Sequence, residues 1–390
     1  MKLWKRAAAT ALALVTSVSL TACAGNSNDA AANKTSDKPS ANGAIEVTDV
    51  VGRTVTLDKQ PERIILGEGR AVFATSIIDR DNPTNHVVAM GEDLVKAAPS
   101  YYERLTETHP EVKDVPTIGN LGKGDVSVEN LVSYKPDVMT ITLDHYNAAK
   151  DAGILDKMDA ADIKYVVTDF RIHPLENTTK SVDIYGQILG NEKKAEEFNS
   201  EWTSTIKDVE DRVAKAEKPS VFVWRAAGYK DGVATVKNSN IGDFVRVAGG
   251  DNIGDRLLDS EFGDITMEKL IQENPDKVLA TGGSWAPKGE KVGHITLGYT
   301  TEEAAARESL HNLSTIPGVD KVTAMNNGET LGMWHQFYDS PLNFLAIQRI
   351  AQWLHPELFK DLDFDKEWSN AHDKYVPFAA SGTFFTTDAK

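Results

Sequence analysis

The segment Ser127-Val-Glu-Asn-Leu-Val-Ser-Tyr-Lys-Pro-Asp-Val-Met139 has a counterpart 139 residues further along the chain, Thr266-Met-Glu-Lys-Leu-Ile-Gln-Glu-Asn-Pro-Asp-Lys-Val278. Each copy begins with a Ser or Thr that can cap a helix and carries a Glu in the first turn. Each ends at Pro-Asp before an apolar strand. The separation is far longer than the roughly 20–50 residues of solenoid repeats, so the pair predicts a duplicated domain.

Apolar runs alternate with helical patterns on both sides of this pair. We expect a hairpin at 46–57, strands at 63–66, 86–90, 138–142, 164–168, 220–224, 277–280 and 330–333, and helices at 70–78, 241–248 and 341–353. Strands that alternate with helices indicate mainly parallel sheets. The expected fold class is therefore α/β, with two lobes that each contain a mainly parallel sheet with flanking helices.

A helical linker separates the two halves. A first helix is expected at 178–189, before the break at Gly190. Apolar side chains then recur at helical spacing and form one face of a longer helix, which ends near Pro219: Phe198, Trp202, Ile206, Val209 and Val213. We therefore predict an N-terminal lobe at 45–174, a linker with a single long backbone helix at 175–218, and a C-terminal lobe at 219–390.

The N-terminus has the pattern of an export signal. A basic start, Met1 to Arg6, precedes the uncharged stretch 7–20, which is shorter than the ~20 apolar residues needed to cross a bilayer. The only cysteine, Cys23, follows Leu-Thr-Ala, where a bacterial lipoprotein is cleaved and acylated. We expect a signal peptide at 1–22 and a lipidated Cys23 with a flexible tether at 23–44; a chance cysteine after an ordinary signal peptide is the alternative. The predicted location is the extracytoplasmic face of the cell membrane.

The net charge excludes some partners. The formal charge is −16, and cleavage after residue 22 would remove three positive and no negative side chains, which makes it −19. A body this acidic does not bind nucleic acid or an anionic membrane surface through general electrostatics. No catalytic motif of a hydrolase or phosphate-binding enzyme occurs, and the nine histidines form no close pair that would bind a bare metal ion. We therefore expect no enzyme and no protein-bound cofactor; a surface hydrolase remains the remote alternative.

Three features together resemble the helical-backbone class of solute-binding lipoproteins of ABC importers. They are the opening hairpin 45–57 with Pro61-Glu-Arg-Ile-Ile65, the paired Glu-x-Leu…Pro-Asp segments, and Trp334-His-Gln-Phe-Tyr-Asp-Ser-Pro-Leu-Asn343 with Trp353-Leu-His-Pro356. The last feature is similar to the ferric-siderophore branch. The resemblance implies a monomer that passes an iron(III)-siderophore complex to an importer permease. It also implies lobes that move little and one docking glutamate per lobe, Glu129 and Glu268, which would otherwise only stabilise their own helices.

The resemblance implies a ligand cleft lined by segments that follow strand ends. The candidate segments are 67–70, 225–229, 282–285 and 334–338, with one further residue after the strand at 138–142. The candidate ligand-binding residues are Arg70, His145, Arg225, Tyr229, Trp285, Trp334, His335 and Tyr338. Arginine can donate to carboxylate or catecholate oxygens, and Trp and Tyr offer flat apolar area.

Several alternatives stay open for these residues. His335 or Tyr338 could complete the coordination shell of the iron, and Trp334 could belong to the core. Haem would need axial ligands that face each other, for which His145 and Tyr229 are candidates. Cobalamin is a third ligand of the same class of proteins.

Overall fold

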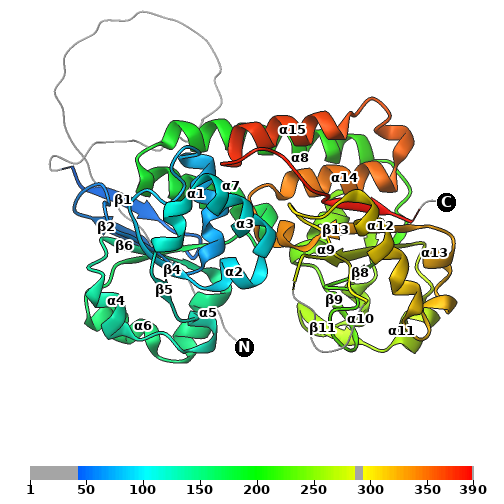
Figure 1. The fold of residues 1–390 in the computed structure, drawn as a ribbon, viewed down its shortest axis with the longest axis horizontal. Helices are drawn as coiled ribbons and strands as arrows, with labels where there is room; N and C mark the ends of the chain where they lie inside the picture. The colour runs from blue at the N-terminus through cyan, green and yellow to red at the C-terminus, as the bar shows by residue number, and fades with distance from the viewer. Residues whose placement is uncertain (1–42, 286–292, 389–390) are drawn as a thin grey trace, which may run out of the picture. The chain divides into compact units, whose positions relative to one another are not determined.

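The structure is a computed structural model that describes residues 43–285 and 293–388 (Figure 1). The predicted signal peptide, Cys23 and nearly all of the predicted tether lie outside these residues. Within the described ranges, no helix combines the length and the apolar character needed to cross a membrane.

The first sheet is fully parallel, with the strand order β5-β4-β3-β6-β7. Its strands are β3 (Ile64–Leu66), β4 (Val87–Gly91), β5 (Thr117–Ile118), β6 (Val138–Thr142) and β7 (Tyr165–Thr168). Helices cover it, so β3, β6 and β7 are buried along their whole length, as their mainly apolar sequences predict. The helices of this half are α1 (Val72–Ile78), α2 (Asp93–Ala97), α3 (Pro99–Thr108), α4 (Val128–Ser133), α5 (Leu143–Asp151) and α6 (Ile154–Ala160).

The second sheet has the order β10-β8-β12-β13-β14, and only its last pair is antiparallel. Its strands are β8 (Ser220–Trp224), β10 (Asp251–Asn252), β12 (Lys277–Gly282), β13 (Thr330–Trp334) and β14 (Phe385–Thr387). The helices of this half are α9 (Asn240–Val247), α10 (Gly254–Leu257), α11 (Met267–Glu273), α12 (Glu303–His311) and α13 (Thr323–Asn326). The mainly parallel α/β character expected from the sequence is confirmed.

Two small antiparallel pairs complete the strands. The expected hairpin is present as β1 (Ile45–Thr48) and β2 (Thr54–Leu57). The second pair, β9 (Val233–Val236) with β11 (Phe262–Ile265), has no counterpart in the sequence-based expectations.

The repeated segments occupy equivalent places in the two sheets. Ser127 and Thr266 cap α4 and α11, and each hydroxyl accepts a backbone N–H three residues further on at 3.2 Å. The strand after α4 is β6, which pairs with β3; the strand after α11 is β12, which pairs with β8. In each lobe, the strand that follows the repeated helix therefore lies directly beside the first strand of the sheet, as expected for a duplicated unit.

Two helices form the linker, α7 (Pro174–Leu189) and α8 (Glu192–Val213). Helix α7 begins four residues earlier than expected because Pro174 suits the first helical position. Gly190, with a φ of 69°, ends it in the left-handed conformation that glycine adopts without strain. Helix α8 has 22 residues, which corresponds to about 33 Å. Its apolar face is buried, and the Trp202 indole donates to Asn343 Oδ1 at 2.7 Å.

Helix α14 (Asn343–Leu354) was expected at 341–353, whereas α15 (Phe364–Tyr375) adds a second connection that the sequence did not predict. Figure 1 shows α15 alongside α8, and the Tyr375 hydroxyl donates to Glu201 Oε2 of α8 at 2.8 Å. Helix α15 also contacts α1 of the first half. The backbone helix is therefore joined by a second helix that returns from the second half to the first.

His372 on α15 predicts how stability depends on pH. Its ring is buried among Tyr299, Trp368 and Phe378, and neither ring nitrogen has a hydrogen-bond partner among the described residues. Burial lowers the pKa of His372 to about 4, from 6.5. The unfolded chain therefore binds a proton more readily than the folded one, and stability falls as the pH drops through 6.5 towards 4. We expect this group alone to cost about 2 kcal/mol between pH 7 and 5.

His372→Phe keeps an aromatic ring at this position and cannot be protonated. The loss of unfolding free energy between pH 7 and 5, measured in urea, should be about 2 kcal/mol smaller for this variant than for the parent. His311→Phe, at an exposed histidine on α12, serves as the control and should keep the parent slope. Equal slopes for parent and His372→Phe would contradict the assignment.

Candidate ligand-binding site

Polar loops from both halves meet where the strands end. In the first half they follow β3, β6 and β7; in the second they follow β8, β12 and β13. The carboxyl ends of parallel strands lie at one edge of a sheet, which is where α/β proteins bind ligands. Six charged side chains from these loops and from α2 and α5 form what we call the charged cluster: Glu68, Arg70, Asp93, Asp144, Arg171 and Asp339.

Arg70 is the first centre of the charged cluster. Its guanidinium forms ion pairs with Glu68 at 2.8 Å, Asp93 at 2.7 Å and Asp339 at 2.9 Å. It also donates to Gln336 Oε1 at 3.2 Å and to the hydroxyl of Tyr338. All three of its nitrogens therefore have partners, and three of these partners, Gln336, Tyr338 and Asp339, follow β13 in the other half.

The glycines before Arg70 bring backbone close to backbone. A Cβ added at Gly69 would lie 2.4 Å from the Gly91 carbonyl oxygen, and one at Gly67 would lie 2.5 Å from that of Thr140. The Gly67-Glu-Gly-Arg70 loop therefore packs tightly against β4 and β6. This close packing gives the two glycines a role within the protein, apart from any ligand.

Arg171 is the second centre of the charged cluster and was missed by the sequence reasoning. It pairs with Glu68 at 2.9 Å, with Asp339 at 2.7 Å and with Asp144. Asp169 holds the loop after β7 by accepting the backbone N–H of Arg171 and Ile172 at 2.9 and 2.7 Å. Arg171 directly follows a predicted strand end, so the rule that selected Arg70 and Arg225 would also have selected it.

The carboxylates of the charged cluster have shifted pKa values. Burial alone would raise the pKa of Glu68, but the charges of Arg171 and Arg70 outweigh burial and lower it. For Asp339, burial is the stronger effect and raises the pKa to about 6, against the opposing charges of Arg171 and Arg70. The two arginines favour the ionised form of both carboxylates, which lie 2.7–2.9 Å from the guanidinium nitrogens.

A second group, which we call the aromatic wall, lies on loops of the C-terminal half and consists of Tyr229, Trp285, His294 and His335. The Trp285 ring lies 4.9 Å from that of Tyr229 and 5.2 Å from that of His335. Trp285 and Gln336 both donate to the Ala97 carbonyl, at 2.8 and 2.7 Å, so this wall contacts the N-terminal half.

His335 is neutral in this environment. Burial, together with the charge of Arg225, lowers the pKa of His335 well below its usual value. The Thr281 hydroxyl lies 2.7 Å from His335 Nδ1 and accepts the Ala226 N–H at 2.9 Å. Its own proton is then available for Nδ1, so we assign the tautomer with the proton on Nε2.

Arg225 follows β8 and differs from the other two arginines. Among the residues that the structure describes, it makes no ion pair, and its Nε has no hydrogen-bond partner. Its guanidinium lies over the Phe262 ring, 4.6 Å from the centroid. Burial lowers the pKa of Arg225, as expected for a cation without a close counter-ion.

Three of the predicted ligand-binding residues, Trp334, His145 and Tyr229, pack against other residues of the protein. Trp334 is 4% exposed and packs against Phe73, Tyr299 and Phe384, so it belongs to the core and not to a cleft wall. His145 is buried, with Nε2 3.5 Å from Glu68 Oε1. Tyr229, the other candidate axial ligand of haem, packs against Trp285 and His294.

Tyr338 joins the two groups. Its ring lies 5.5 Å from the guanidinium carbon of Arg70 and 5.4 Å from that of Arg171. The role of Tyr338 or His335 as a ligand to iron stays a prediction. Within residues 43–285 and 293–388, no group of three or more His, Cys, Asp or Glu side chains is placed to hold a metal ion.

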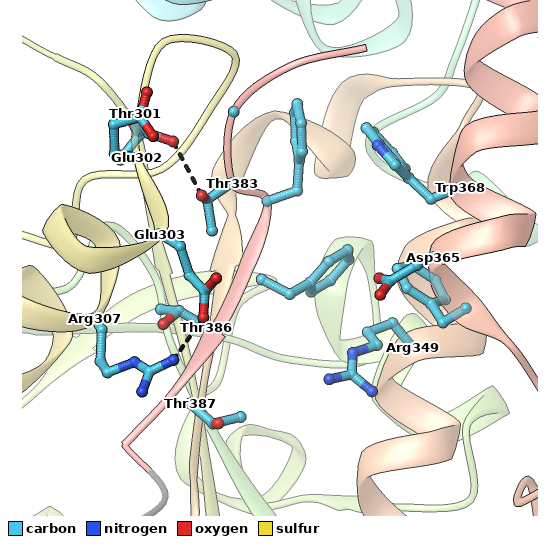
Figure 2. Close-up of a pocket in the computed structure, with 14 residues that line it drawn as sticks. Thr301, Glu302, Glu303, Arg307, Arg349, Asp365, Trp368, Thr383, Thr386 and Thr387 are labelled. Carbon is cyan, nitrogen blue, oxygen red and sulfur yellow. Dashed lines mark hydrogen bonds and ion pairs between the residues drawn. The ribbon is translucent and has the colours of Figure 1, made fainter.

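A separate hollow of about 490 Å³ lies between α12, β14 and α15 (Figure 2). Figure 2 shows Arg307 paired with Glu303, at 2.6 Å, and the Thr383 hydroxyl donating to the Thr301 carbonyl at 3.0 Å. Arg349 lies over the Phe364 ring and donates to Gln352. The hollow shares no residue with the charged cluster or the aromatic wall.

Residues 60–329 match the family model described as "Periplasmic binding protein". The chain belongs to this family. The family consists of TroA-like substrate-binding proteins of ABC transporters, the class that the sequence resembles.

Among curated proteins, the chain is 26% identical over 291 residues to YvrC of Bacillus subtilis (strain 168), named an uncharacterized ABC transporter substrate-binding lipoprotein. That match covers 74% of this chain and 84% of YvrC. The chain is also 29% identical over 187 residues to IsdE of Staphylococcus aureus (strain Newman), named a high-affinity heme uptake system protein; this covers 46% of the chain and 58% of IsdE.

Among solved structures, the TroA-like periplasmic binding protein FepB of Veillonella parvula matches with a TM-score of 0.79 and 28% identity, covering 88% of this chain and 99% of that one. The molybdate-binding protein MolA of Haemophilus influenzae matches with a TM-score of 0.67 and 16% identity, covering 87% and 99%. At that identity, MolA supports the fold alone.

Proposed function

We propose that this substrate-binding protein captures an iron(III)-siderophore complex, without turnover, and delivers it to an ABC importer permease. The observation that carries the proposal is the meeting of strand-end loops from both halves, where the aromatic wall faces loops that carry buried arginines. Flat aromatic rings and arginine donors suit a bulky, partly aromatic chelate with exposed oxygens. The matched region of the family model and the similarity to FepB support the substrate-binding role but do not name the cargo.

Haem is the second candidate ligand. The similarity to IsdE favours it, because that relative is named a heme uptake protein. Against it, His145 is buried, and its Nε2 lies 3.5 Å from Glu68 Oε1, so this nitrogen is turned to a carboxylate of the protein. A Soret band in the purified protein would favour haem over a siderophore complex.

The docking proposal rests on Glu129 and Glu268. Both are exposed and lie in the first turn of α4 and α11. Backbone hydrogen bonds, together with Ser127 and Thr266, lower the pKa of each carboxylate, so both are ionised at neutral pH. Each carboxylate therefore presents a fixed negative charge at the same place in its lobe, complementary to a cationic side chain of a permease.

The surroundings of Glu129 add a second argument. It borders a hollow of about 470 Å³ with a partly apolar lining. Val132, at its edge, is 44% exposed. A charged residue beside exposed apolar surface is a common composition for a protein-binding site.

We further propose that the chain is anchored by acylation of Cys23. The proposal is supported by the basic and apolar segments before Cys23 and by the similarity to YvrC, which is named a lipoprotein. Acyl chains on Cys23, followed by a polar tether, would hold the binding domain at the extracytoplasmic face of the membrane.

For the ligand, we expect a ferric siderophore to quench the fluorescence of the purified protein, because Trp285 lies in the aromatic wall. The titration should give a sub-micromolar Kd. Trp285→Phe keeps an aromatic ring and should lose most of the quenching. A flat titration across catecholate, hydroxamate and citrate-type complexes, with parent protein that melts cooperatively, would rule the proposal out.

For docking, the double variant Glu129→Lys and Glu268→Lys should abolish uptake of radioactive iron by cells and leave the ligand Kd unchanged. The double variant Glu210→Lys and Glu217→Lys changes the net charge equally at two other exposed positions and should support normal uptake. Normal uptake by the first variant would remove the docking assignment.

For anchoring, Cys23→Ser should move the protein from the membrane fraction to the culture medium or the periplasmic fraction. The parent should incorporate labelled palmitate, because acylation requires the thiol. Palmitate labelling of Cys23→Ser, or its unchanged recovery with membranes, would contradict the proposal.

A further inference from the structure

The arginines of the charged cluster are already neutralised by the protein. Arg70 and Arg171 contribute two positive charges, and the four carboxylates Glu68, Asp93, Asp144 and Asp339 contribute four negative ones. The cluster therefore has a formal charge of −2. A site for a strongly anionic ligand needs an excess of positive charge instead.

These ion pairs are buried and shared. Glu68 and Asp339 each contact both arginines, and the side-chain exposures of the four groups are 2%, 3%, 7% and 11%. A ligand anion that took one arginine would leave two buried carboxylates to share the single remaining arginine, which is unfavourable. The two carboxylates thus compete permanently with any anionic ligand for the two arginines.

The donor groups of Arg70 are also occupied. Its Nε binds Asp93, its Nη1 binds Gln336 and Tyr338, and its Nη2 binds Glu68. Arg70 therefore acts as a positioning residue that joins the halves. Arg225, which makes no ion pair among the described residues, is the cation with donors left for a ligand.

We infer that the site selects ferric complexes of zero or positive net charge, of the trihydroxamate type, with one acceptor group near Arg225. The inference rests on the proposed function and names its substrate class. Three hydroxamate monoanions balance the charge of iron(III), whereas three catecholate dianions leave three negative charges. With Arg225 included, the named charged side chains that the structure describes at the site sum to −1, so they do not repel a neutral complex but do repel a triply anionic one. The aromatic wall supplies the apolar contact area that a neutral complex needs.

The direct test compares two ligands on the full chain purified in detergent. Tryptophan quenching is measured with ferrichrome, a neutral trihydroxamate complex, and with ferric enterobactin, a triply anionic triscatecholate complex. We expect the Kd for ferrichrome to be at least tenfold lower. Equal or tighter binding of ferric enterobactin would overturn the inference and leave the proposed function intact. Failure of both, and of the wider panel, would instead overturn the proposed function.

A variant tests the cause of the preference. Asp339→Asn removes one negative charge and keeps an oxygen that can accept from the arginines, so the affinity ratio should shift towards the catecholate complex by about three- to tenfold. Asp361→Asn removes a carboxylate from an exposed pair with Arg212, outside the site, and should leave the ratio unchanged. An unchanged ratio in a folded Asp339→Asn protein, checked by its melting curve, would contradict the charge argument. If that variant does not fold, the ratio in the parent protein decides.

Discussion

The sharing of two carboxylates by two arginines is the interaction on which the rest of the structure depends. Glu68 belongs to the first half and Asp339 to the second, and each contacts both Arg70 and Arg171. Because these charges are buried, each is stable only while the other three are in place. The cluster therefore fixes the register between the strand ends of the two sheets, and it positions Tyr338 and the loops that carry the aromatic wall.

The sequence predicted the elements that follow from local rules. The caps at Ser127 and Thr266, the buried strands and the break at Gly190 depend on neighbouring residues, and the structure confirms them. It did not predict β14 or the return of α15 along α8, because these depend on packing between distant segments. A three-residue strand such as β14 has too short a pattern to recognise, and its pairing is decided by the sheet edge that it meets.

The loops of the candidate site could also be predicted from local rules, but the contacts of their side chains could not. Rules about strand ends select loops, and they placed Arg70, Arg225, Trp285 and His335 at the meeting of the halves. Rules about strand ends do not state which way a side chain points. Trp334 was therefore predicted to line the cleft, although it is the last residue of β13 and is buried in the core. These rules also do not reveal pairing. Arg70 is neutralised by Glu68, Asp93 and Asp339, whereas Arg225 lies over Phe262, and these contacts appear only in the folded chain.

The second crossing by α15 has a mechanical consequence. A single helix resists stretching but allows two bodies to rotate about its axis, as a rod does. Two helices side by side, tied by the Tyr375–Glu201 hydrogen bond and by the packing of Phe198 on Tyr375, resist twisting as well. The motion left to the two sheets is a shallow rocking that opens the strand ends while the helices stay closed.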